Sequence, residues 1–172
     1  MTPKQNINLQ LFTHADDINE LTQLLNLAYK KWKDVGFNYL AASQTADITK
    51  KRIQNAQCFI LKNQEQIIAT VTYYKPLSKI NSEHPLYKQP NIATYGQLAV
   101  HPNFQKQGIA SAIIKFVEQL AKQDKSTQII IDTAQNNTQL VNYYIGKGYK
   151  VIDTTNWSTT NYTSVFLAKN II

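Results

Sequence analysis

The stretch LAVHPNFQKQGIASAII, from Leu98 to Ile114, joins an apolar run to a run of small and apolar residues through a polar segment that holds one proline and one glycine. The run IATYGQLAV, ending at Val100, predicts a strand, and GIASAIIKFVEQLAKQ predicts a helix that begins near Gly108. Unpaired backbone N–H groups and the positive end of the helix dipole converge where such a strand turns into a helix. The stretch therefore predicts an anion site, with phosphate as the natural guest.

The composition of the turn allows a phosphate to approach, although a simpler reading is that Gly108 only begins a helix. A P-loop is excluded because no Gly-Lys-Ser/Thr follows the glycine. A dinucleotide-binding fold is a more serious rival, because Asp132 ends the next strand near the place of a ribose-binding acid. That fingerprint needs further glycines and places its first glycine directly after the strand, whereas the segment 101–107 intervenes here.

Length and composition predict one globular domain over residues 1–172, with 43% hydrophobic and 17% charged residues. No apolar run approaches the roughly 20 residues that span a bilayer, and the segment MTPKQNINLQ lacks the apolar core of a signal peptide. We therefore expect a soluble, cytoplasmic protein with no membrane partner. The single cysteine, Cys58, stands in the apolar run CFIL, which predicts a core thiol.

A net charge of +7 permits an anionic partner such as a phosphorylated cofactor, a nucleic acid or an acidic protein. The basic clusters at 30–33 and 50–52 lie near the ends of predicted helices, and we interpret them as solvated surface. No aromatic signature of RNA binding is present, so nucleic acid is possible but not favoured. The three histidines are scattered and only one cysteine exists, which predicts no metal site.

Hydrophobic periodicity along the rest of the chain predicts an order of elements. A strand at 7–12 precedes a helix at 18–32, whose start is marked by Thr13 and Asp16, and Thr45 or Asp47 opens a second helix to about residue 55. Two strands follow, joined by a turn at 63–66, and the proline-containing segment 76–90 is a long loop that we expect to be functional. After the strand and helix of the opening stretch come a buried strand, a helix ending near Gly148 and two final strands, at 127–132, 136–148, 149–153 and 161–169.

Two blocks of the sequence resemble the motifs of the GNAT superfamily of acyl-CoA N-acyltransferases. LAVHPNFQKQGIASAII is similar to the acyl-CoA-binding motif, with Gln105, Gly108 and Ala110 at the Gln/Arg-x-x-Gly-x-Gly/Ala positions. NNTQLVNYYIGKGYKVI is similar to a later motif through Asn137 and Tyr144, with its lysine displaced to Lys147. The resemblance extends over nearly the full chain and implies an α/β (α+β) fold with a mixed, roughly seven-stranded sheet flanked by about four helices.

The resemblance also implies how a donor, acetyl-CoA, is held as co-substrate, with no metal. Backbone amides from the Gln/Arg position through the first helical turn cradle the CoA pyrophosphate in the family. The strand before them splays from its neighbour and offers backbone groups to the pantetheine arm, with Gly96 a plausible place for a bulge. Asn137 is expected to bond the pantetheine or phosphate region from the other wall. These expected cofactor-binding residues are Leu98, Val100, Gln105, Lys106, Gln107, Gly108, Ile109, Ala110, Ser111 and Asn137.

Tyr144 is the expected catalytic residue, as the general acid that protonates the departing CoA thiolate. The alternative is a core aromatic at a helix end, and Tyr143 beside it is interpreted as packing. Many relatives carry a carboxylate on the splayed strand, which deprotonates the amine. Residues 95–97 of this chain contain no such carboxylate. His101 next to Pro102 is more typical of a turn, and the segment containing Glu83 and His84 reaches the cleft only if its loop folds over, so loss of the proton to water is expected.

The predicted activity is direct acetyl transfer from acetyl-CoA to a primary amine, with a small-molecule acceptor favoured. The sequence shows no activated cysteine or serine, and this argues against a covalent acyl-enzyme. The alternatives are a non-catalytic acyl-CoA-binding module, or transfer to a protein N-terminus, a lysine or charged RNA. The resemblance places the aromatic residues Tyr29, Trp32, Phe37 and Tyr39 near the acceptor, and the protein is expected to be a monomer or homodimer.

Overall fold

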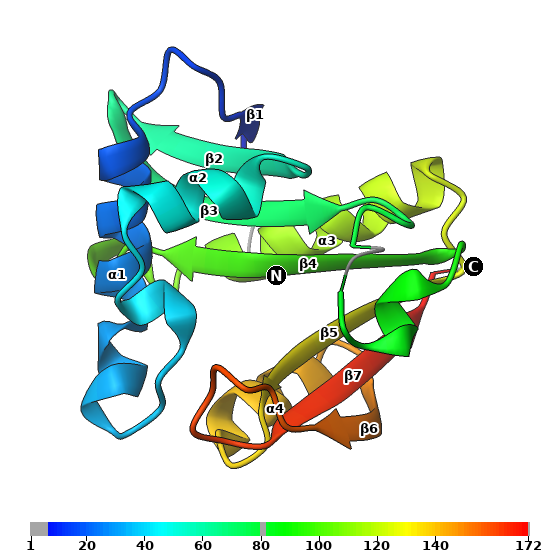
Figure 1. The fold of residues 1–172 in the computed structure, drawn as a ribbon. Helices are drawn as coiled ribbons and strands as arrows, with labels where there is room; N and C mark the ends of the chain where they lie inside the picture. Colours follow the sequence, from blue (N-terminus) through cyan, green and yellow to red (C-terminus); the bar gives the residue numbers. More distant parts are fainter. Residues whose placement is uncertain (1–6, 80–81, 172) are drawn as a thin grey trace.

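The computed structural model describes residues 7–79 and 82–171 and forms one seven-stranded mixed sheet with helices on both faces (Figure 1). The strands lie side by side in the order β1-β2-β3-β4-β5-β7-β6. Their bounds are β1 Gln10–Leu11, β2 Gln57–Asn63, β3 Gln66–Tyr74, β4 Ile92–Val100, β5 Gln128–Ala134, β6 Lys150–Thr155 and β7 Ser164–Asn170. The helices are α1 Ile18–Asp34, α2 Ala46–Ile53, α3 Ile109–Gln123 and α4 Thr138–Ile145, with short 3-10 turns η1 Leu40–Ala42, η2 Pro85–Lys88 and η3 Pro102–Phe104.

The predicted fold class is confirmed, as is the order of the main elements. The strands β1 to β4 pair antiparallel in succession, and β4 and β5 form the parallel pair. A doubly wound dinucleotide fold requires a mostly parallel sheet, so that alternative does not apply.

Alternation along β2 explains how two helices cover opposite faces of the sheet. Phe59 and Leu61 belong to the apolar cluster that contains α3, whereas Cys58 and Ile60 belong to the cluster that contains α1. On α1 the buried residues recur at helical spacing, at Leu21, Leu24, Leu25 and Ala28. Burying one such leucine contributes about 1.5–3 kcal/mol, so the two helices fix the first half of the sheet between them.

The parallel contact between β4 and β5 is short, and this makes a wedge in the sheet. Only Ile92 with Gln128 and Ala93 with Ile129 pair across it, after which the two strands diverge (Figure 1). The edge of β4 beyond Ala93 therefore faces an opening rather than a strand. This opening holds the candidate site.

The bulge in β4 is displaced from the expected glycine. Pairing with β3 shifts register between Thr70 and Thr72, opposite the segment from Gly96 to Ala99. Gln97 takes the left-handed backbone conformation there, with φ of 51°, while Gly96 has no positive φ. The Gln97 side chain is buried and bonds Gln44 and Thr72 at 3.0 and 2.9 Å, which compensates for an unfavourable backbone conformation.

The remaining differences lie at element ends. The strand expected over 7–12 is the two-residue β1, and the N-cap of α1 is Asp17, whose carboxylate accepts the Asn19 N–H at 2.7 Å. Thr13 and Asp16 instead close a turn one residue earlier, with a 2.8 Å bond from the Thr13 N–H to the Asp16 carboxylate. Thr45 caps α2 as expected, and α4 ends at Ile145 before Gly148. Within the expected loop 76–90, residues 80 and 81 lie outside the described residues.

Candidate functional site

A cleft of about 440 Å³ opens in the wedge where β4 leaves β5. It is walled by α1, the end of β4, the segment that leads into α3, the first turn of α3, and one face of α4. The lining residues are Ala28, Tyr29, Lys31, Trp32, Leu98, Ala99, Val100, Phe104, Gln105, Lys106, Gly108, Ile109, Ala110, Ser111, Gln139, Leu140, Tyr143 and Tyr144.

A wider depression of about 560 Å³ lies on the outer surface of α1. It is lined by exposed or half-buried side chains of α1, including Gln23, Lys30 and Asp34, together with the buried Ala42 of η1. Lys30 and Asp34 already pair with each other at 2.6 Å. The cleft at the wedge combines aromatic walls with open backbone amides, so we place the site there.

The segment from Lys106 to Ser111 presents a continuous run of unbonded backbone N–H groups. Among the described residues, none of these N–H groups has a hydrogen-bond acceptor, and the first α3 bond of this kind runs from the Ala112 N–H to the Gly108 carbonyl at 3.0 Å. Lys106 and Gly108 both take left-handed backbone conformations, with φ of 62° and 84°. These amides and the helix dipole together form a cradle for an anion.

The segment before this cradle is held in place by its own side chains. Gln105 donates from its side-chain nitrogen to the Val100 carbonyl at 2.9 Å, which ties the turn back to β4. His101 accepts the Asn103 N–H at 3.2 Å through Nδ1 and starts the turn η3. His101 therefore serves the turn, as its neighbouring proline suggested.

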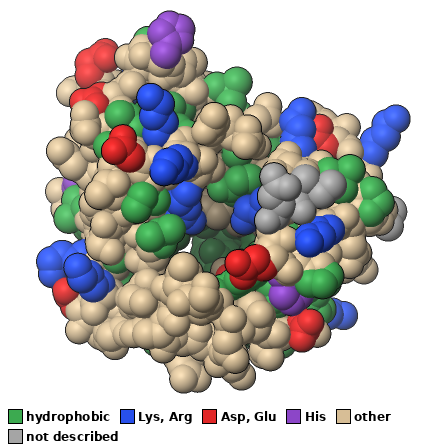
Figure 2. Space-filling model, viewed as in Figure 1, with side chains coloured by type: hydrophobic (Ala, Val, Ile, Leu, Met, Phe, Trp, Pro, Cys, Tyr) green, Lys and Arg blue, Asp and Glu red, His purple; other side chains and the backbone are tan. Residues whose placement is uncertain are grey.

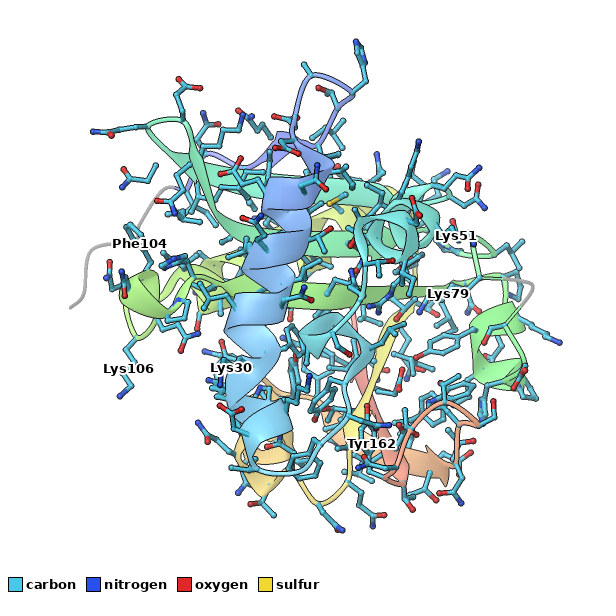
Figure 3. The ribbon with its side chains drawn as sticks, turned by 60° about the vertical axis from the view of Figure 1, so that its left-hand side comes forward. Lys30, Lys51, Lys79, Phe104, Lys106 and Tyr162 are labelled. Atoms are coloured by element: carbon cyan, nitrogen blue, oxygen red, sulfur yellow. The ribbon has the colours of Figure 1, made fainter. Side chains whose placement is uncertain are left out.

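Two lysines add positive charge to the cradle. Lys31 on α1 and Lys106 both line the cleft. Burial lowers the pKa of Lys31, and the nearby charge of Lys106 lowers that pKa further. A bound anion reduces the repulsion between two neighbouring ammonium groups. The charge of the lysines and the unbonded backbone amides therefore both favour an anion. Figure 3 shows the labelled Phe104 and Lys106 on one side of the molecule, at the segment before α3.

The open edge of β4 offers further backbone groups. The His101 N–H donates toward β3, to the Ile68 carbonyl at 2.8 Å. Because backbone groups alternate sides along a strand, the N–H groups of Leu98 and Val100 face the wedge. The Leu98 carbonyl on the same edge accepts the Tyr29 hydroxyl at 3.1 Å.

Tyr144 on α4 faces the same cleft with an uncommitted hydroxyl. Its side chain is half-buried, and no hydrogen bond to its hydroxyl exists among the described residues. Burial raises the pKa of Tyr144 well above its ordinary value, and Tyr29 raises it further. The phenol therefore stays protonated at neutral pH and can donate a proton. Tyr143 differs, because its hydroxyl lies 3.3 Å from Ser111 Oγ.

The structure brings most of the expected cofactor-binding residues to one cleft. Gln107 and Asn137 are the exceptions, because neither lines it. Gln107 contributes only its N–H to the cradle, while its exposed side chain donates to the Asn103 carbonyl at 3.4 Å. Asn137 is buried and caps α4, accepting the Leu140 N–H at 3.3 Å and donating to the Tyr39 hydroxyl at 3.2 Å. Each end of the amide makes one hydrogen bond and keeps a second N–H or lone pair, so its expected contact with the donor stays a prediction.

Several lining residues were given another role from the sequence or were missed. Tyr29 and Trp32 line the donor cleft rather than only the acceptor region, and Lys31, interpreted as solvated surface, lines it too. Gln139 and Leu140 were also missed. Helical spacing places them beside Tyr143 and Tyr144 on α4, and this was the available signal.

The residues considered as bases lie away from Tyr144 or serve other contacts. His84 packs on Phe166 with ring centroids 4.4 Å apart, and its Nδ1 accepts the Leu86 N–H. Glu83 is exposed. Cys58 is buried and bonded to Thr70, and burial raises its pKa, so it is not a thiolate nucleophile.

Two absences hold for the described residues. Residues 7–79 and 82–171 bring no three His, Cys, Asp or Glu side chains together in a way that could hold a metal ion. No helix in the same part of the chain has the length and apolar character needed to cross a membrane.

Comparison with known proteins supplies the family. Residues 18–149 match the model of the acetyltransferase (GNAT) family. The chain is 28% identical over 135 residues to S-(2-succino)cysteine N-acetyltransferase of Bacillus subtilis, covering 77% of this chain and 78% of that protein. It is 26% identical over 129 residues to N-acetyltransferase 8B of Rattus norvegicus, covering 72% of this chain and 53% of that protein.

The fold is also shared with solved structures. A GNAT family acetyltransferase from Elizabethkingia anophelis with acetyl-CoA bound superposes with a TM-score of 0.69 at 18% identity, covering 97% of this chain and 99% of that one. An N-acetyltransferase from Staphylococcus aureus gives a TM-score of 0.71 at 17% identity, covering 96% and 97%. The family match spans the splayed strand, the amide cradle and the helix that carries Tyr144, and the chain belongs to the GNAT family of acetyltransferases.

Proposed function

We propose that this protein transfers the acetyl group of acetyl-CoA directly to a primary amine of a small molecule. One observation carries the proposal: the unbonded amides from Lys106 to Ser111 and the uncommitted hydroxyl of Tyr144 border the same cleft. An anion cradle and a proton donor in one cleft suit a thioester attached to a diphosphate.

The pyrophosphate of the donor would lie on the cradle, with Lys31 and Lys106 beside it. The pantetheine arm would follow the open edge of β4, where the N–H groups of Leu98 and Val100 face the wedge. This placement directs the thioester toward Tyr144 on the opposite wall. A solved relative of the same fold holds acetyl-CoA, which supports this choice of donor.

The reaction would proceed by attack of a neutral amine on the thioester carbonyl. The C–N bond forms, the C–S bond breaks, and Tyr144 donates its proton to the departing thiolate. The attacking nitrogen loses its proton to water, because no described carboxylate lines the cleft. Positioning of the two reactants and hydrogen bonds from β4 amides to the carbonyl oxygen would supply most of the acceleration.

A small-molecule acceptor is supported by the named substrate of one relative. The Bacillus subtilis protein acts, by its name, on an S-substituted cysteine, which is an amino acid. The test is a screen in which purified protein and acetyl-CoA are incubated with each member of a panel of small amines. The release of free thiol is measured in each reaction. Release of CoA that depends on both the amine and the protein is the expected result.

A non-catalytic acyl-CoA-binding module is the second candidate, favoured by the lack of a carboxylate base in the cleft. Calorimetry of acetyl-CoA binding separates the two. Tight binding of acetyl-CoA without thiol release over the whole panel, including a peptide N-terminus, a lysine peptide and aminoacylated RNA, would establish the binding module instead.

A further inference from the structure

The wedge has a second face that the donor does not occupy. In the view of Figure 2 the surface is hollowed at its centre, with several Lys and Arg side chains around the hollow and an acidic side chain at its lower rim. Figure 3 places Lys79 on the side of the molecule opposite Phe104 and Lys106, with Tyr162 lower down between them. The side chains on this second face are therefore candidates for recognising the acceptor.

Two cations, Arg52 of α2 and Lys79 after β3, both neighbour Tyr74 there. The hydroxyl of Tyr74 donates to the Arg52 carbonyl at 2.9 Å, and the Lys79 ammonium lies 4.3 Å from the centre of the same tyrosine ring. Lys79 also lies 4.6 Å from the ring centre of Tyr87. The Arg52 guanidinium donates to the Gln44 side-chain oxygen at 2.6 Å.

Neither cation has a carboxylate partner among the described residues, whose ion pairs involve other lysines. Asp132 of β5 is near enough to favour the charged form of Lys79. Its two oxygens are already occupied, accepting the Tyr87 hydroxyl at 2.5 Å and the Trp157 indole N–H at 3.1 Å. Burial lowers the pKa of Lys79 to about 8, and the Arg52 charge acts in the same direction. Neither cation makes a direct ion pair among the described residues, so both charged groups are open to an incoming carboxylate.

A row of tyrosines extends from the donor cleft toward β5. Tyr29 lines the donor cleft and packs against Tyr39 with centroids 5.7 Å apart, and Tyr39 packs against Tyr162 at 5.1 Å. The Arg52 charge is felt at both ends of the row, because it lowers the pKa of Tyr29 and of Tyr162 against the larger effect of burial. The tyrosine row therefore lies within the field of Arg52 and reaches the donor cleft through Tyr29.

We propose that Arg52 and Lys79 bind the carboxylate of the acceptor, so that the substrate is a small amino acid or amino acid derivative. The assignment rests on the proposed acetyl transfer. The planar guanidinium can present two donors to a carboxylate, and the ammonium adds a point charge beside it. The tyrosine row would then guide the amine of the same molecule toward the thioester.

Matched substrates test the assignment. Each of a set of α-amino acids is compared with its methyl ester, which keeps the amine and side chain but lacks the charge, and O-phosphoethanolamine serves as a phosphate-bearing amine. We expect kcat/KM for the best acid to exceed that of its ester at least tenfold. Equal use of acid and ester, or stronger use of O-phosphoethanolamine than of every acid, would overturn the carboxylate assignment.

Single substitutions test whether Arg52 and Lys79 cause the preference for the acid over its ester. Arg52→Gln and Lys79→Met should each remove most of the preference for the acid while leaving the ester rate and the acetyl-CoA dissociation constant unchanged. Lys51→Met is the matched control, because Lys51 is an exposed neighbour of Arg52 on α2 and should keep the preference (Figure 3). A preference that survives in both test variants would contradict the proposal. Thermal unfolding checks that each variant folds. If Arg52→Gln is destabilised by the loss of its bond to Gln44, Lys79→Met still tests the proposal by itself.

A binding measurement separates this inference from the proposed function. A panel of N-acetyl amino acids, with their methyl esters, is titrated into protein saturated with CoA, and this requires no turnover. Carboxylate-dependent binding that both variants weaken and Lys51→Met preserves supports the inference even if catalysis fails. Acetyl-CoA binding and turnover without carboxylate-dependent recognition would overturn the inference alone, whereas failure to bind acetyl-CoA would overturn the proposed function.

Discussion

At the scale of single residues, the proposed chemistry depends on which hydroxyl is uncommitted. Tyr143 and Tyr144 are adjacent on α4 and both line the cleft, but only Tyr143 lies within hydrogen-bond distance of Ser111. The raised pKa of Tyr144 makes it a weak acid that holds its proton, which suits donation to a thiolate formed in the reaction.

The replacement Tyr144→Phe removes the proposed acid and keeps the ring. We expect kcat to fall about 100-fold, as is usual for loss of a general acid, with little change in acetyl-CoA affinity. Steady-state thiol release and calorimetry measure the two quantities. Tyr143→Phe is the matched control and should retain kcat within a few-fold, and an unchanged kcat in Tyr144→Phe would remove the assigned role.

Lys79 predicts a pH dependence for carboxylate binding. With its pKa at about 8, Lys79 is charged below that pH and neutral above it. Burial raises the pKa of Tyr74 and of Tyr87, so these two neighbours stay neutral from pH 7 to 9. The affinity of CoA-saturated protein for an N-acetyl amino acid should therefore weaken as pH rises through 8.

Calorimetry at several pH values measures this dependence. In Lys79→Met the affinity should be lower and nearly independent of pH over the same range. A wild-type affinity that is constant from pH 7 to 9 would contradict the placement of the Lys79 ammonium against the acceptor.

Some residues of the site could be predicted from the sequence and others could not. Gly108 and Tyr144 were predictable because a motif fixes their local structure, a helix start and a helix face. Asn137 was predictable as a position, but its bond to Tyr39 was not, because Tyr39 is far away in the chain and only the fold brings the two together. Arg52 and Lys79 come from different elements, and nothing local in the sequence reports their proximity.

At the scale of elements, the wedge and the cradle create the site together. The short β4–β5 pairing opens the sheet, and the left-handed residues Lys106 and Gly108 turn the chain so that the first amides of α3 remain unbonded. Apolar alternation predicted the strands well, whereas the bulge at Gln97 was not predictable, because glutamine carries no preference for that conformation and its side-chain partners are distant in sequence.

The replacement Gly108→Ala tests the cradle. Its added Cβ meets no atom within 4 Å, but the φ of 84° strains any residue with a side chain, at a cost of roughly 1–2 kcal/mol in stability. We also expect acetyl-CoA affinity to fall about tenfold, because the methyl group and the shifted backbone disturb the anion's approach.

Gly36→Ala is the matched control for this variant. Gly36 also has positive φ, at 100°, and open space around its would-be Cβ, but it does not line the cleft. The control should lose similar stability in urea unfolding and keep its acetyl-CoA affinity. Equal affinities in the two variants would show that the cradle is not the anion site.

At the scale of the whole molecule, donor binding should couple to stability, because α1, β4, α3 and α4 all border the cleft. A ligand at 100 times its dissociation constant stabilises the native state by about 2.7 kcal/mol, which corresponds to roughly 5–10 °C in Tm for a domain of this size. Thermal unfolding with acetyl-CoA and with CoA should show such shifts, while pantetheine, which lacks the diphosphate, should shift Tm far less at the same concentration. Equal shifts with pantetheine would contradict the role of the amide cradle.

The most direct test of the account is a crystal structure of the protein with acetyl-CoA. We expect the diphosphate within hydrogen-bond distance of the amides between Lys106 and Ser111, the pantetheine along the open edge of β4, and the thioester sulfur within reach of the Tyr144 hydroxyl. A diphosphate bound elsewhere, or a thioester that points away from Tyr144, would contradict it.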